Sequence, residues 1–509
     1  MATKEALKTL PHKTVVTLTY HEITQDPRVF KQARALVEAG HQVHAFCAQL
    51  PGFVATETVQ GIKITRFDWE ASDWVRPDSL ADFPFLKRSK QVATELFEPF
   101  AQSATRFHQK KAGLAELITP QDWEKLDLGY YKKFKGKERK TRKAEYLKTN
   151  LKLTIKQLPK RLFGGGAQLN PIELRGMGKS LGRDFRDLYQ LTSLVFAGNL
   201  QRVVGDLRPD VVHAHDLYCL PGGINLAQSV GAKLIYDAHE YEPSRATKMQ
   251  VGSEDFVKDL EDDCLEHVDH LITVAAALAD LYGARFAGPP PSLIFNAPEV
   301  DLDNVFTASD TAPHIIPIRT RAAVSDQTPL VVFTGGIQQG ARGMDKVLEA
   351  LTELPEVHLA TLGPRHEASD EWFLKHAETF GVKDRVHLCD AVPAADVCAT
   401  IQSANAAIIP IQDASISYRF SMPNKLFEAA FAGLPICVSN LPEMLAFVTD
   451  LGIGRGMDQT DPHSIAGAVR DVLDNPQSYE AAPEKREKLA TYYSWPAQVS
   501  RLLAIYDTL

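Results

Sequence analysis

Two charged residues, Lys425 and Glu428, follow Pro423 in the segment SMPNKLFEAAFAGLPICVSNLPE, residues 421–443. The proline biases the residue before it away from helix, and apolar residues after it recur at helical spacing, so a helix is expected directly after Pro423. The unpaired N–H groups of a helix start attract anions, and a nearby ammonium strengthens that attraction. A carboxylate one turn later can accept hydrogen bonds from a diol. This spacing suits a nucleotide, with diphosphate at the helix start and ribose on Glu428.

A glycine-rich loop lies between an apolar run and a helical pattern in PLVVFTGGIQQGARGMDKVLEAL, residues 329–351. Gly335 and Gly336 let backbone N–H groups approach a phosphate, and Arg342 can hold two oxygens at once. The loop contains neither G-x-G-x-x-G nor the P-loop GK[ST]. By itself it is compatible with any Rossmann-like domain.

Histidines and carboxylates also follow two apolar runs in the first half of the chain. DVVHAHD (210–216) places His215 at the end of one predicted strand, and KLIYDAHE (233–240) places Asp237, His239 and Glu240 at the end of the next. A helix is predicted between these two strands, near residues 224–230. Open α/β sheets put their sites at the carboxyl ends of strands. A single histidine is more often a satisfied core residue, but two such strand ends favour a functional role for His215.

The opening of the chain predicts a β-α-β unit. Residues 14–20 and 42–47 form apolar runs, and residues 30–38 between them have a helical pattern that ends at Gly40. The intervening loop HEITQDPRV carries Asp26 and Arg28. Residues 59–67 read as one further strand.

The alternation of strands and helices predicts two doubly wound parallel-sheet domains with an insertion in the first. Apolar runs at residues 358–364, 385–392 and 406–411 supply further strands of the second domain. We therefore expect an N-terminal domain (1–300) with a mostly helical, basic insertion (70–190), a linker (301–327), a second domain (328–485), and a C-terminal helix (486–509) that returns to the first domain.

The insertion concentrates positive charge in a chain whose net charge is −8. Between residues 131 and 162 there are 13 Lys/Arg and 2 Glu, a local net charge of +11. Leucines and an isoleucine form a helical stripe there, flanked by Lys148, Lys152 and Lys156. The helix either lies on an anionic membrane surface or packs on its own domain with solvated lysines, and both readings stay open. Nucleic acid is a weaker option, since no known binding module surrounds the block.

Metal and disulfide chemistry are not predicted. Cys264, His267 and His270 span a helix-to-strand junction without a fourth ligand, and the Asp301–Asp303 pair lies in a predicted linker. The six cysteines contain no C-x-x-C pair, which indicates buried thiols in a reducing compartment. With no signal-peptide core and no run of about 18 apolar residues, we expect a cytoplasmic protein, peripheral to a membrane at most.

Taken together, these motifs resemble those of the family-four glycosyltransferases, retaining enzymes of the GT-B fold. The resemblance rests on PNKLFEAAFAGLP with SNLPE, on DPRV followed by GHQV, and on the G-G…R-G loop. It implies two Rossmann-like domains that face a cleft, with the donor on the second domain and the acceptor on the first.

The resemblance also assigns roles to residues. It implies that Arg342 and Lys425 hold the diphosphate, that Glu428 holds the ribose, and that His215 reaches the transferred sugar. Asp26, Arg28, His239 and Glu240 are then placed on the acceptor and sugar side. The family often has Glu-x7-Glu, but Phe420 stands where the first Glu is expected, so contacts to the sugar are expected from Ser421 or Asn424.

The expected activity is transfer of a sugar from a nucleotide-diphosphate-sugar to a glycan or lipid-linked acceptor, with retention and without metal or cofactor. Two alternatives stay open. One is a nucleotide-sugar 2-epimerase of the same architecture, and the other is an inactive glycan- or membrane-binding scaffold, for which Phe420 is the argument. An oxidoreductase is disfavoured because no dinucleotide fingerprint occurs.

Overall fold

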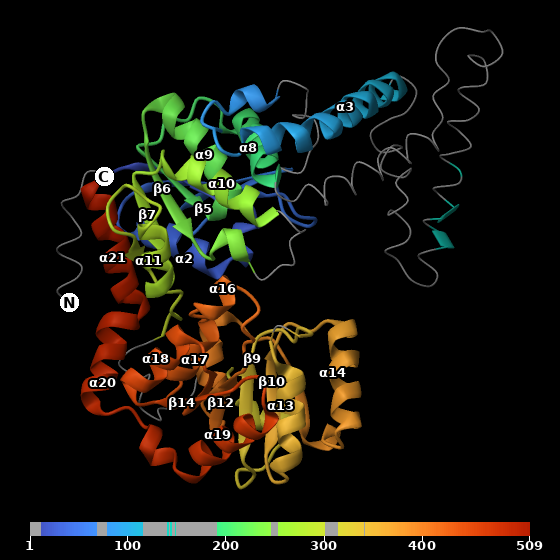
Figure 1. Ribbon diagram of the computed structural model, residues 1–509, viewed down its shortest axis with the longest axis vertical. Helices are drawn as coiled ribbons and strands as arrows, with labels where there is room; N and C mark the ends of the chain where they lie inside the picture. The colour runs from blue at the N-terminus through green and yellow to red at the C-terminus, as the bar shows by residue number, and fades with distance from the viewer. Residues whose placement is uncertain are drawn as a thin grey trace. The chain divides into compact units, whose positions relative to one another are not determined.

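The computed structural model describes residues 12–68, 79–115, 191–245, 253–300, 314–340 and 342–509, together with residues 140, 141, 143, 144 and 148. Two compact units divide the chain. One consists of Met1–Arg66 with Arg208–Leu509, and the other of Phe67–Leu207. The larger unit holds two β-sheets, each with helices between its strands (Figure 1).

The first sheet has eight strands within the described residues, in the order β3-β4-β2-β1-β5-β6-β7-β8. From β2 through β1 and β5 to β8 the neighbours pair in parallel. Its strands are β1 (Thr14–Leu18), β2 (Gln42–Ala48), β3 (Thr56–Val59), β4 (Ile62–Phe67), β5 (Val211–His215), β6 (Lys233–Ala238), β7 (His270–Thr273) and β8 (Ser292–Leu293). The helices that accompany them are α2 (Pro27–Glu38), α9 (Asp216–Val230), α10 (Ser253–Leu265) and α11 (Ala276–Gly283).

The predicted opening β-α-β unit is present, with one boundary shifted. Helix α2 begins at Pro27, three residues earlier than the apolar pattern indicated, because Asp26 caps it. The Asp26 carboxylate accepts hydrogen bonds from the backbone N–H groups of Arg28 and Val29, which are otherwise unpaired in the first turn. Proline at the first helical position suits this start.

The single strand predicted over residues 59–67 is wrong. Two antiparallel strands, β3 and β4, occupy residues 56–67, and Val59 pairs with Ile62 across the turn between them. Gln60 and Gly61 both have positive φ, 49° and 83°. This is the backbone of a two-residue hairpin turn, for which a glycine is the usual signal.

Helix α9 also begins earlier than its apolar pattern suggested. The prediction placed it near residues 224–230, whereas it follows β5 directly and starts at Asp216. Asp216 has φ +60°, a left-handed conformation that is uncommon for a residue other than glycine. The abrupt change from strand to helix brings the side chains of His215 and Asp216 to the carboxyl edge of the sheet.

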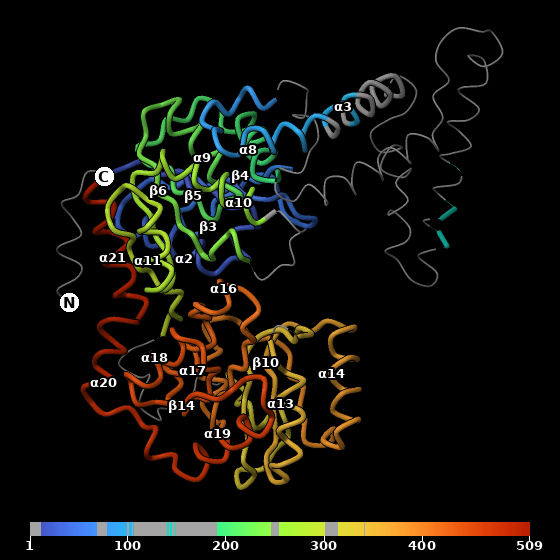
Figure 2. The backbone as a smooth tube through the Cα atoms, in the orientation of Figure 1, coloured from blue at the N-terminus to red at the C-terminus, as the bar shows by residue number. Residues whose placement is uncertain are grey.

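The second sheet has six strands within the described residues, all parallel, in the order β11-β10-β9-β12-β13-β14. Its strands are β9 (Leu330–Thr334), β10 (His358–Gly363), β11 (Val386–Asp390), β12 (Ala406–Ile409), β13 (Ile436–Ser439) and β14 (Gly454–Met457). Its helices are α12 (Ile318–Ala322), α13 (Met344–Ala350), α14 (Glu367–Thr379), α15 (Val397–Ile401), α16 (Ile416–Arg419), α17 (Asn424–Phe431), α18 (Pro442–Leu451), α19 (Pro462–Asp474) and α20 (Pro483–Lys488). The chain can be followed through these elements in Figure 2.

The two motifs around which the second domain was predicted fold as expected. Helix α17 starts at Asn424, directly after Pro423, and the chain turns at Gly433 with φ +72° before strand β13. Strand β9 leads through the glycine-rich loop to α13. The loop after β9 and the start of α17, which follows the neighbouring parallel strand β12, therefore both lie at the carboxyl edge of the same sheet.

Part of the predicted linker is ordered on the second sheet. Helix α12 contacts β10 and β11, and the buried Arg319 donates hydrogen bonds to the carbonyl groups of Ser403, Ser325 and Thr328. Residues 301–313, including Asp301 and Asp303, lie outside the described residues.

The smaller unit contains the predicted insertion. Its described helices are α3 (Lys90–Ala115), inside the predicted bounds of the insertion, and α8 (Thr192–Val204), directly after them. Of the basic stripe, Lys148 lies in a helical stretch and is exposed, while Lys152 and Lys156 lie outside the described residues.

The C-terminal helix α21 (Trp495–Thr508) packs against α2 (Figure 1). Its apolar face joins the core under the first sheet, where Leu502, Leu503 and Tyr506 lie with residues of β1, β2 and β5. Within the described part of the chain, no helix combines the length and the apolar character needed to cross a bilayer.

Candidate functional site

The glycine loop of the second sheet brings three predicted donor-binding residues together. Gly335 has φ +106°, and a Cβ atom there would lie 3.2 Å from Nη1 of Arg342 and 3.3 Å from Nζ of Lys425. Nη1 of Arg342 also donates to the carbonyl of Gly336, at 3.3 Å. The basic side chains of Arg342 and Lys425 thus converge on the backbone of the glycine loop.

Lys425 is held in a setting that disfavours its own charge. Its Nζ lies 4.1 Å from the centre of the Phe333 ring. Burial, and then the neighbouring Arg342, lower the pKa of Lys425 well below its usual range. An anion placed between Lys425 and Arg342 would offset both effects, which is the electrostatic character of a phosphate site.

Glu428 lies one turn along α17 from Lys425. Its Oε2 accepts a hydrogen bond from Oγ1 of Thr334, the last residue of β9, at 2.9 Å. Burial raises the pKa of Glu428, although the Thr334 hydrogen bond, Lys425 and Lys31 act in the opposite direction. Thr334 thus fixes one carboxylate oxygen and leaves the other for a ligand.

The two residues expected to replace the missing family carboxylate, Ser421 and Asn424, lie four residues and one residue before Lys425 in the chain. Oγ of Ser421 donates to the carbonyl of Tyr418 at 2.9 Å, so it is already engaged with the end of α16. Asn424 is the exposed first residue of α17. Phe420 is half-buried directly after α16.

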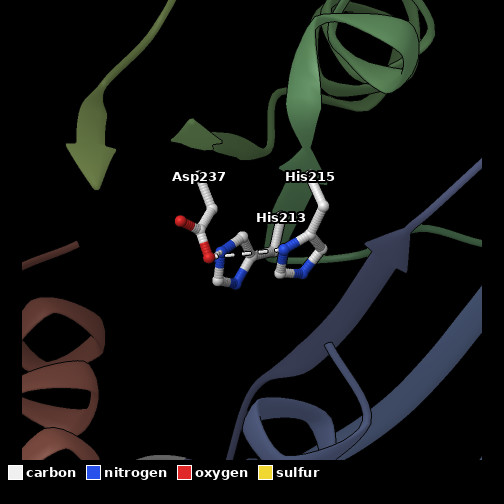
Figure 3. A group of neighbouring side chains, drawn as sticks. All are labelled: His213, His215 and Asp237. Carbon is white, nitrogen blue, oxygen red and sulfur yellow. Dashed lines mark ion pairs between the residues drawn. The ribbon is translucent and has the colours of Figure 1, made fainter. Parts of the chain in front are cut away.

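At the carboxyl edge of the first sheet, the predicted cluster is also assembled. His215 and Asp237 are directly opposite in the pairing of β5 with β6. Figure 3 shows Asp237 facing His215 and His213. Oδ2 of Asp237 lies 3.4 Å from Nδ1 of His215 and 4.0 Å from Nε2 of His213. All three side chains are buried.

Asp237 is the centre of this cluster. It accepts hydrogen bonds from Nε and Nη2 of Arg28, at 3.2 and 2.7 Å, and from Nε2 of Gln32 at 2.9 Å. Burial raises the pKa of a carboxyl group, but the Arg28 guanidinium and His239 outweigh it and hold the pKa of Asp237 well below its usual range. Asp237 is therefore ionised and fully engaged.

The spacing of His213, His215 and Asp237 could accommodate a metal ion, since their ligand atoms lie within 4.8 Å of one another. The donor set does not fit one. The carboxylate that would have to bind the ion is already paired with the guanidinium of Arg28 and with Gln32. A second cation against Arg28 would be repelled, so we assign these residues to positioning.

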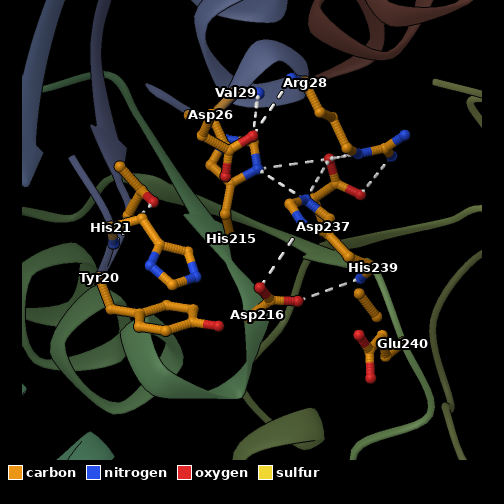
Figure 4. Close-up of polar contacts among 12 residues, drawn as sticks. Tyr20, His21, Asp26, Arg28, Val29, His215, Asp216, Asp237, His239 and Glu240 are labelled. Atoms are coloured by element: carbon orange, nitrogen blue, oxygen red, sulfur yellow. Dashed lines mark hydrogen bonds and ion pairs between the residues drawn. The ribbon is translucent and has the colours of Figure 1, made fainter. Parts of the chain in front are cut away.

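His239 lies between two carboxylates (Figure 4). Its Nδ1 is 3.5 Å from Oδ2 of Asp216, and its Nε2 is 3.4 Å from Oδ2 of Asp237. Burial lowers the pKa of a histidine, but Asp216 and Asp237 outweigh it and raise the pKa of His239 to about 9. His239 is therefore an imidazolium at neutral pH.

The remaining candidate residues of the first domain, Arg28, Asp26 and Glu240, make contacts with other protein groups. Arg28 is buried, with its third nitrogen donating to the carbonyl of Ile294 at 2.8 Å, and Asp26 caps α2. Glu240 accepts from Nε of Arg245 at 3.1 Å. Arg28 thus holds the Asp237 carboxylate in place through its buried ion pair.

The structure forms two groups from the predicted residues. On the second sheet it joins Gly335, Gly336, Arg342, Lys425 and Glu428, and at the edge of the first sheet it joins His215, His239 and Arg28 through Asp237. Sequence reasoning missed Thr334, Gln32 and Asp216. Each lies inside a segment that the sequence had indicated, but the neighbour that it contacts depends on the pairing of distant strands.

Two family models match the chain. One, described as "Glycosyl transferases group 1", matches residues 328–475, and the other, "Glycosyl transferase 4-like domain", matches residues 164–296. The two matches coincide with the sequences that build the second sheet and the β5–β8 half of the first.

A curated relative and two solved structures are similar over most of the chain. The glycogen synthase of Mycobacterium tuberculosis is 25% identical over 303 residues, 59% of this chain and 69% of its own. Sucrose-phosphate synthase of Thermosynechococcus elongatus has a TM-score of 0.61 at 14% identity and covers 98% of this chain and 99% of its own. HepE of Anabaena, solved with UDP and glucose, has a TM-score of 0.56 at 10% identity over 98% of this chain and 100% of its own.

These likenesses are to transferases with the GT-B arrangement of two parallel-sheet α/β domains. They do not favour the epimerase alternative.

Proposed function

Because the chain belongs to the group 1, family-four glycosyltransferases and has their GT-B fold, we propose that it transfers a hexose from a nucleotide-diphosphate-sugar to a glycan or lipid-linked acceptor. The observation that carries this proposal is the convergence of Arg342 and Lys425 on Gly335, with Glu428 one turn further on. UDP is the first nucleotide to consider, since HepE was solved with UDP and glucose.

The residues on the second sheet suit the departure of a diphosphate. Negative charge grows on the diphosphate as the glycosidic bond breaks, and preorganised donors aimed at that charge lower the barrier. In this proposal Arg342, Lys425 and the N-terminus of α17 supply those donors without a metal ion. Charge-assisted hydrogen bonds contribute about 1.5–3 kcal/mol each.

The recognition of the nucleoside is assigned to Glu428. Its Oε2 is occupied by Thr334, so its other oxygen is the acceptor for a ribose hydroxyl. His215, at the edge of the first sheet, is assigned to the transferred sugar. Retention of configuration follows the family resemblance and belongs to the same proposal.

A cytoplasmic location, with the basic segment around Lys148, Lys152 and Lys156 against an anionic membrane, is also part of this proposal. Its support is the local charge of +11 between residues 131 and 162. Binding of the full-length protein to anionic but not neutral vesicles, with loss on neutralising these three lysines, is the expected result.

The Arg342→Ala variant tests the donor site. We expect turnover of the nucleotide-sugar to fall by about 100-fold or more, since removing one preorganised donor typically costs that much. The fold should be unaffected, because the side chain lies on a loop and is partly exposed. Donor consumption and thermal unfolding are measured side by side.

The matched control is Arg455→Ala, which removes an exposed arginine paired with Asp471 on the same domain. It should leave turnover unchanged. Near-wild-type turnover of Arg342→Ala would remove this residue from the site.

The activity itself is established with a panel of UDP- and GDP-sugars, each with glycan and lipid-linked acceptors. We expect product only when both donor and acceptor are present, an unchanged rate after chelation, and a product anomer matching that of the donor by NMR. Isomerised sugar formed without any acceptor would contradict the proposal.

A further inference from the structure

Asp216 has an unusual backbone and a buried side chain. Its φ of +60° lies in the left-handed region, and its carboxylate is buried although it is the first residue of a helix. Strained conformations of this kind persist where the surrounding structure requires a particular side-chain position. The contacts of the Asp216 carboxylate therefore indicate which neighbour it positions.

Both oxygens of the Asp216 carboxylate lie close to His239. Oδ1 accepts a hydrogen bond from the backbone N–H of His239 at 3.3 Å, and Oδ2 lies 3.5 Å from Nδ1 of its ring (Figure 4). This arrangement fixes the place of the ring and favours its protonated form.

The distances show where His239 directs its other N–H. Nε2 lies 3.2 Å from Nδ1 of His215 and 3.4 Å from Oδ2 of Asp237. Only the first is within the usual range of an N–H hydrogen bond. Oδ2 of Asp237 also already accepts from Arg28 and Gln32, which use its two lone pairs.

This contact determines the tautomer of His215. An imidazolium has no lone pair, so His239 must be the donor and Nδ1 of His215 the acceptor. The proton of a neutral His215 is then on Nε2. Burial lowers the pKa of His215, which favours its neutral form. Among the described residues, no protein group accepts from this buried Nε2.

We propose that Asp216 is a positioning residue: by holding His239 as a donor to Nδ1 of His215, it leaves Nε2–H of His215 to donate to an oxygen of the substrate. The use of this donor rests on the proposed transfer reaction. The tautomer itself does not, and it can be measured without substrate.

The charged and titratable groups around His239 come from several elements. Asp216 and Asp237 favour its charge, whereas Arg28 of α2 opposes it, and His21, His213 and His215 are close enough to interact with it. Because the pKa of His239 is raised above its ordinary value, the charge is present at neutral pH and is lost as the pH rises through about 9. The donation from His239 should therefore be lost at alkaline pH, whereas at acidic pH it persists until His215 itself is protonated and loses its acceptor lone pair.

The first test is NMR of the full-length protein labelled with ¹⁵N-histidine, with signals assigned from His215→Asn and His239→Asn variants. At pH 7.5 we expect both ring nitrogens of His239 to be protonated, and His215 to carry its proton on Nε2. A neutral His239, or a proton on Nδ1 of His215, would overturn the proposal. This measurement uses the wild-type chain, so it does not depend on the folding of the Asp216 variant or on the reaction.

The second test is Asp216→Asn, which keeps the shape of the side chain and a residue type that tolerates a left-handed backbone. We expect the titration of His239 to move down by about one to three pH units, as for loss of an adjacent opposite charge. The alkaline limb of kcat/KM should move with it, so that activity lost at pH 8 is recovered at pH 6.

Asp210→Asn is the matched control, since Asp210 precedes the same strand at its other end and accepts from the N–H of Thr14. The Asp210→Asn variant should leave the pH of the alkaline limb of kcat/KM unchanged. A loss of activity in Asp216→Asn that is the same at all pH values would indicate a merely structural role and overturn the proposal. If no transfer is found with any donor, the proposed function fails while the NMR result still decides the tautomer.

Discussion

At the scale of single residues, the proposed donor site depends on side chains that orient other side chains. Glu428 can bind a ribose only if its carboxylate has a fixed orientation, and α17 alone does not provide one. The hydroxyl of Thr334, at the end of β9, provides this orientation by donating a hydrogen bond of 2.9 Å to the Glu428 carboxylate. A hydrogen bond to a charged group contributes about 1.5–3 kcal/mol. Thr334 is therefore expected to influence nucleotide recognition without touching the nucleotide.

Replacing Thr334 with valine should reduce the ability of the protein to distinguish UDP from 2′,3′-dideoxy-UDP. We expect the ratio of the two dissociation constants to fall by about 10-fold, because the Glu428 carboxylate loses its fixed orientation. Isothermal titration calorimetry measures both constants.

Thr334→Ser is the matched control, since it retains the hydroxyl, and it should keep the wild-type ratio. An unchanged ratio in Thr334→Val would show that Thr334 does not orient the ribose ligand. An equal loss of affinity for both nucleotides would have the same meaning.

At the scale of elements, the close approach of the end of β10 to the glycine loop shapes the proposed phosphate site. The end of β10 comes so near the glycine loop that a Cβ on Gly363 would lie 2.4 Å from the carbonyl of Gly335. The backbone N–H of Gly335 donates to the carbonyl of Leu362 at 2.8 Å. Strand pairing therefore continues into the loop and holds its backbone in place for the ligand.

Gly335→Ala should weaken nucleotide binding by about 10-fold or more. A methyl group there meets the ends of Arg342 and Lys425 at 3.2 and 3.3 Å, so these flexible side chains must move away from the phosphate position. Loss of one charge-assisted contact is enough for an effect of that size. Nucleotide affinity by calorimetry is the measurement.

Gly340→Ala separates this effect from backbone strain. Gly340 also has positive φ, +78°, but a Cβ there meets nothing within 4 Å. Both variants should lose a similar free energy of unfolding, about 1–2 kcal/mol, because alanine disfavours a positive φ, while only Gly335→Ala should lose nucleotide affinity. Equal affinities in the two variants would contradict this account of the loop.

At the scale of the whole molecule, the last helix, α21, packs into the same hydrophobic core as the first strands of the chain. Leu502 of α21 is fully buried among side chains of β1, β2 and β5, and Nζ of Lys13 donates to the carbonyl of Tyr506. Oη of Tyr506 also lies 2.9 Å from Nδ1 of His213, behind His215. The C-terminal segment is thus part of the support for the first-sheet cluster.

Leu502→Ala should destabilise the protein by about 2–5 kcal/mol, as for other buried leucines that leave a cavity. Urea unfolding of the full-length chain measures the change. The control Ala504→Ser, on the exposed side of the same helix, should stay within about 0.5 kcal/mol. If both variants unfolded like the wild type, α21 would not belong to the core.

Much of the fold could be predicted from the sequence because its rules are local. Pro423 set the start of α17, Gly335 and Gly336 indicated a loop after β9, and apolar runs located the central strands of both sheets, although not β8 or β14. The errors were also local. The sequence predicted a continuous strand across the hairpin turn at Gln60–Gly61. Helices α2 and α9 begin earlier than predicted, because Asp26 caps α2 and because the left-handed backbone of Asp216 lets α9 begin directly after β5.

The residue types of the site were determined by the sequence alone: a basic pair with a glutamate near a helix start, and histidines with carboxylates at two strand ends. Only the tertiary structure decided their partners. Arg28 pairs with Asp237, Thr334 with Glu428, and Asp216 with His239, across separations of 209, 94 and 23 residues. Such contacts depend on strand order, on helix ends and on a strained backbone at one residue. Charge and hydrogen bonding act over a few ångströms in space, whatever the distance along the chain.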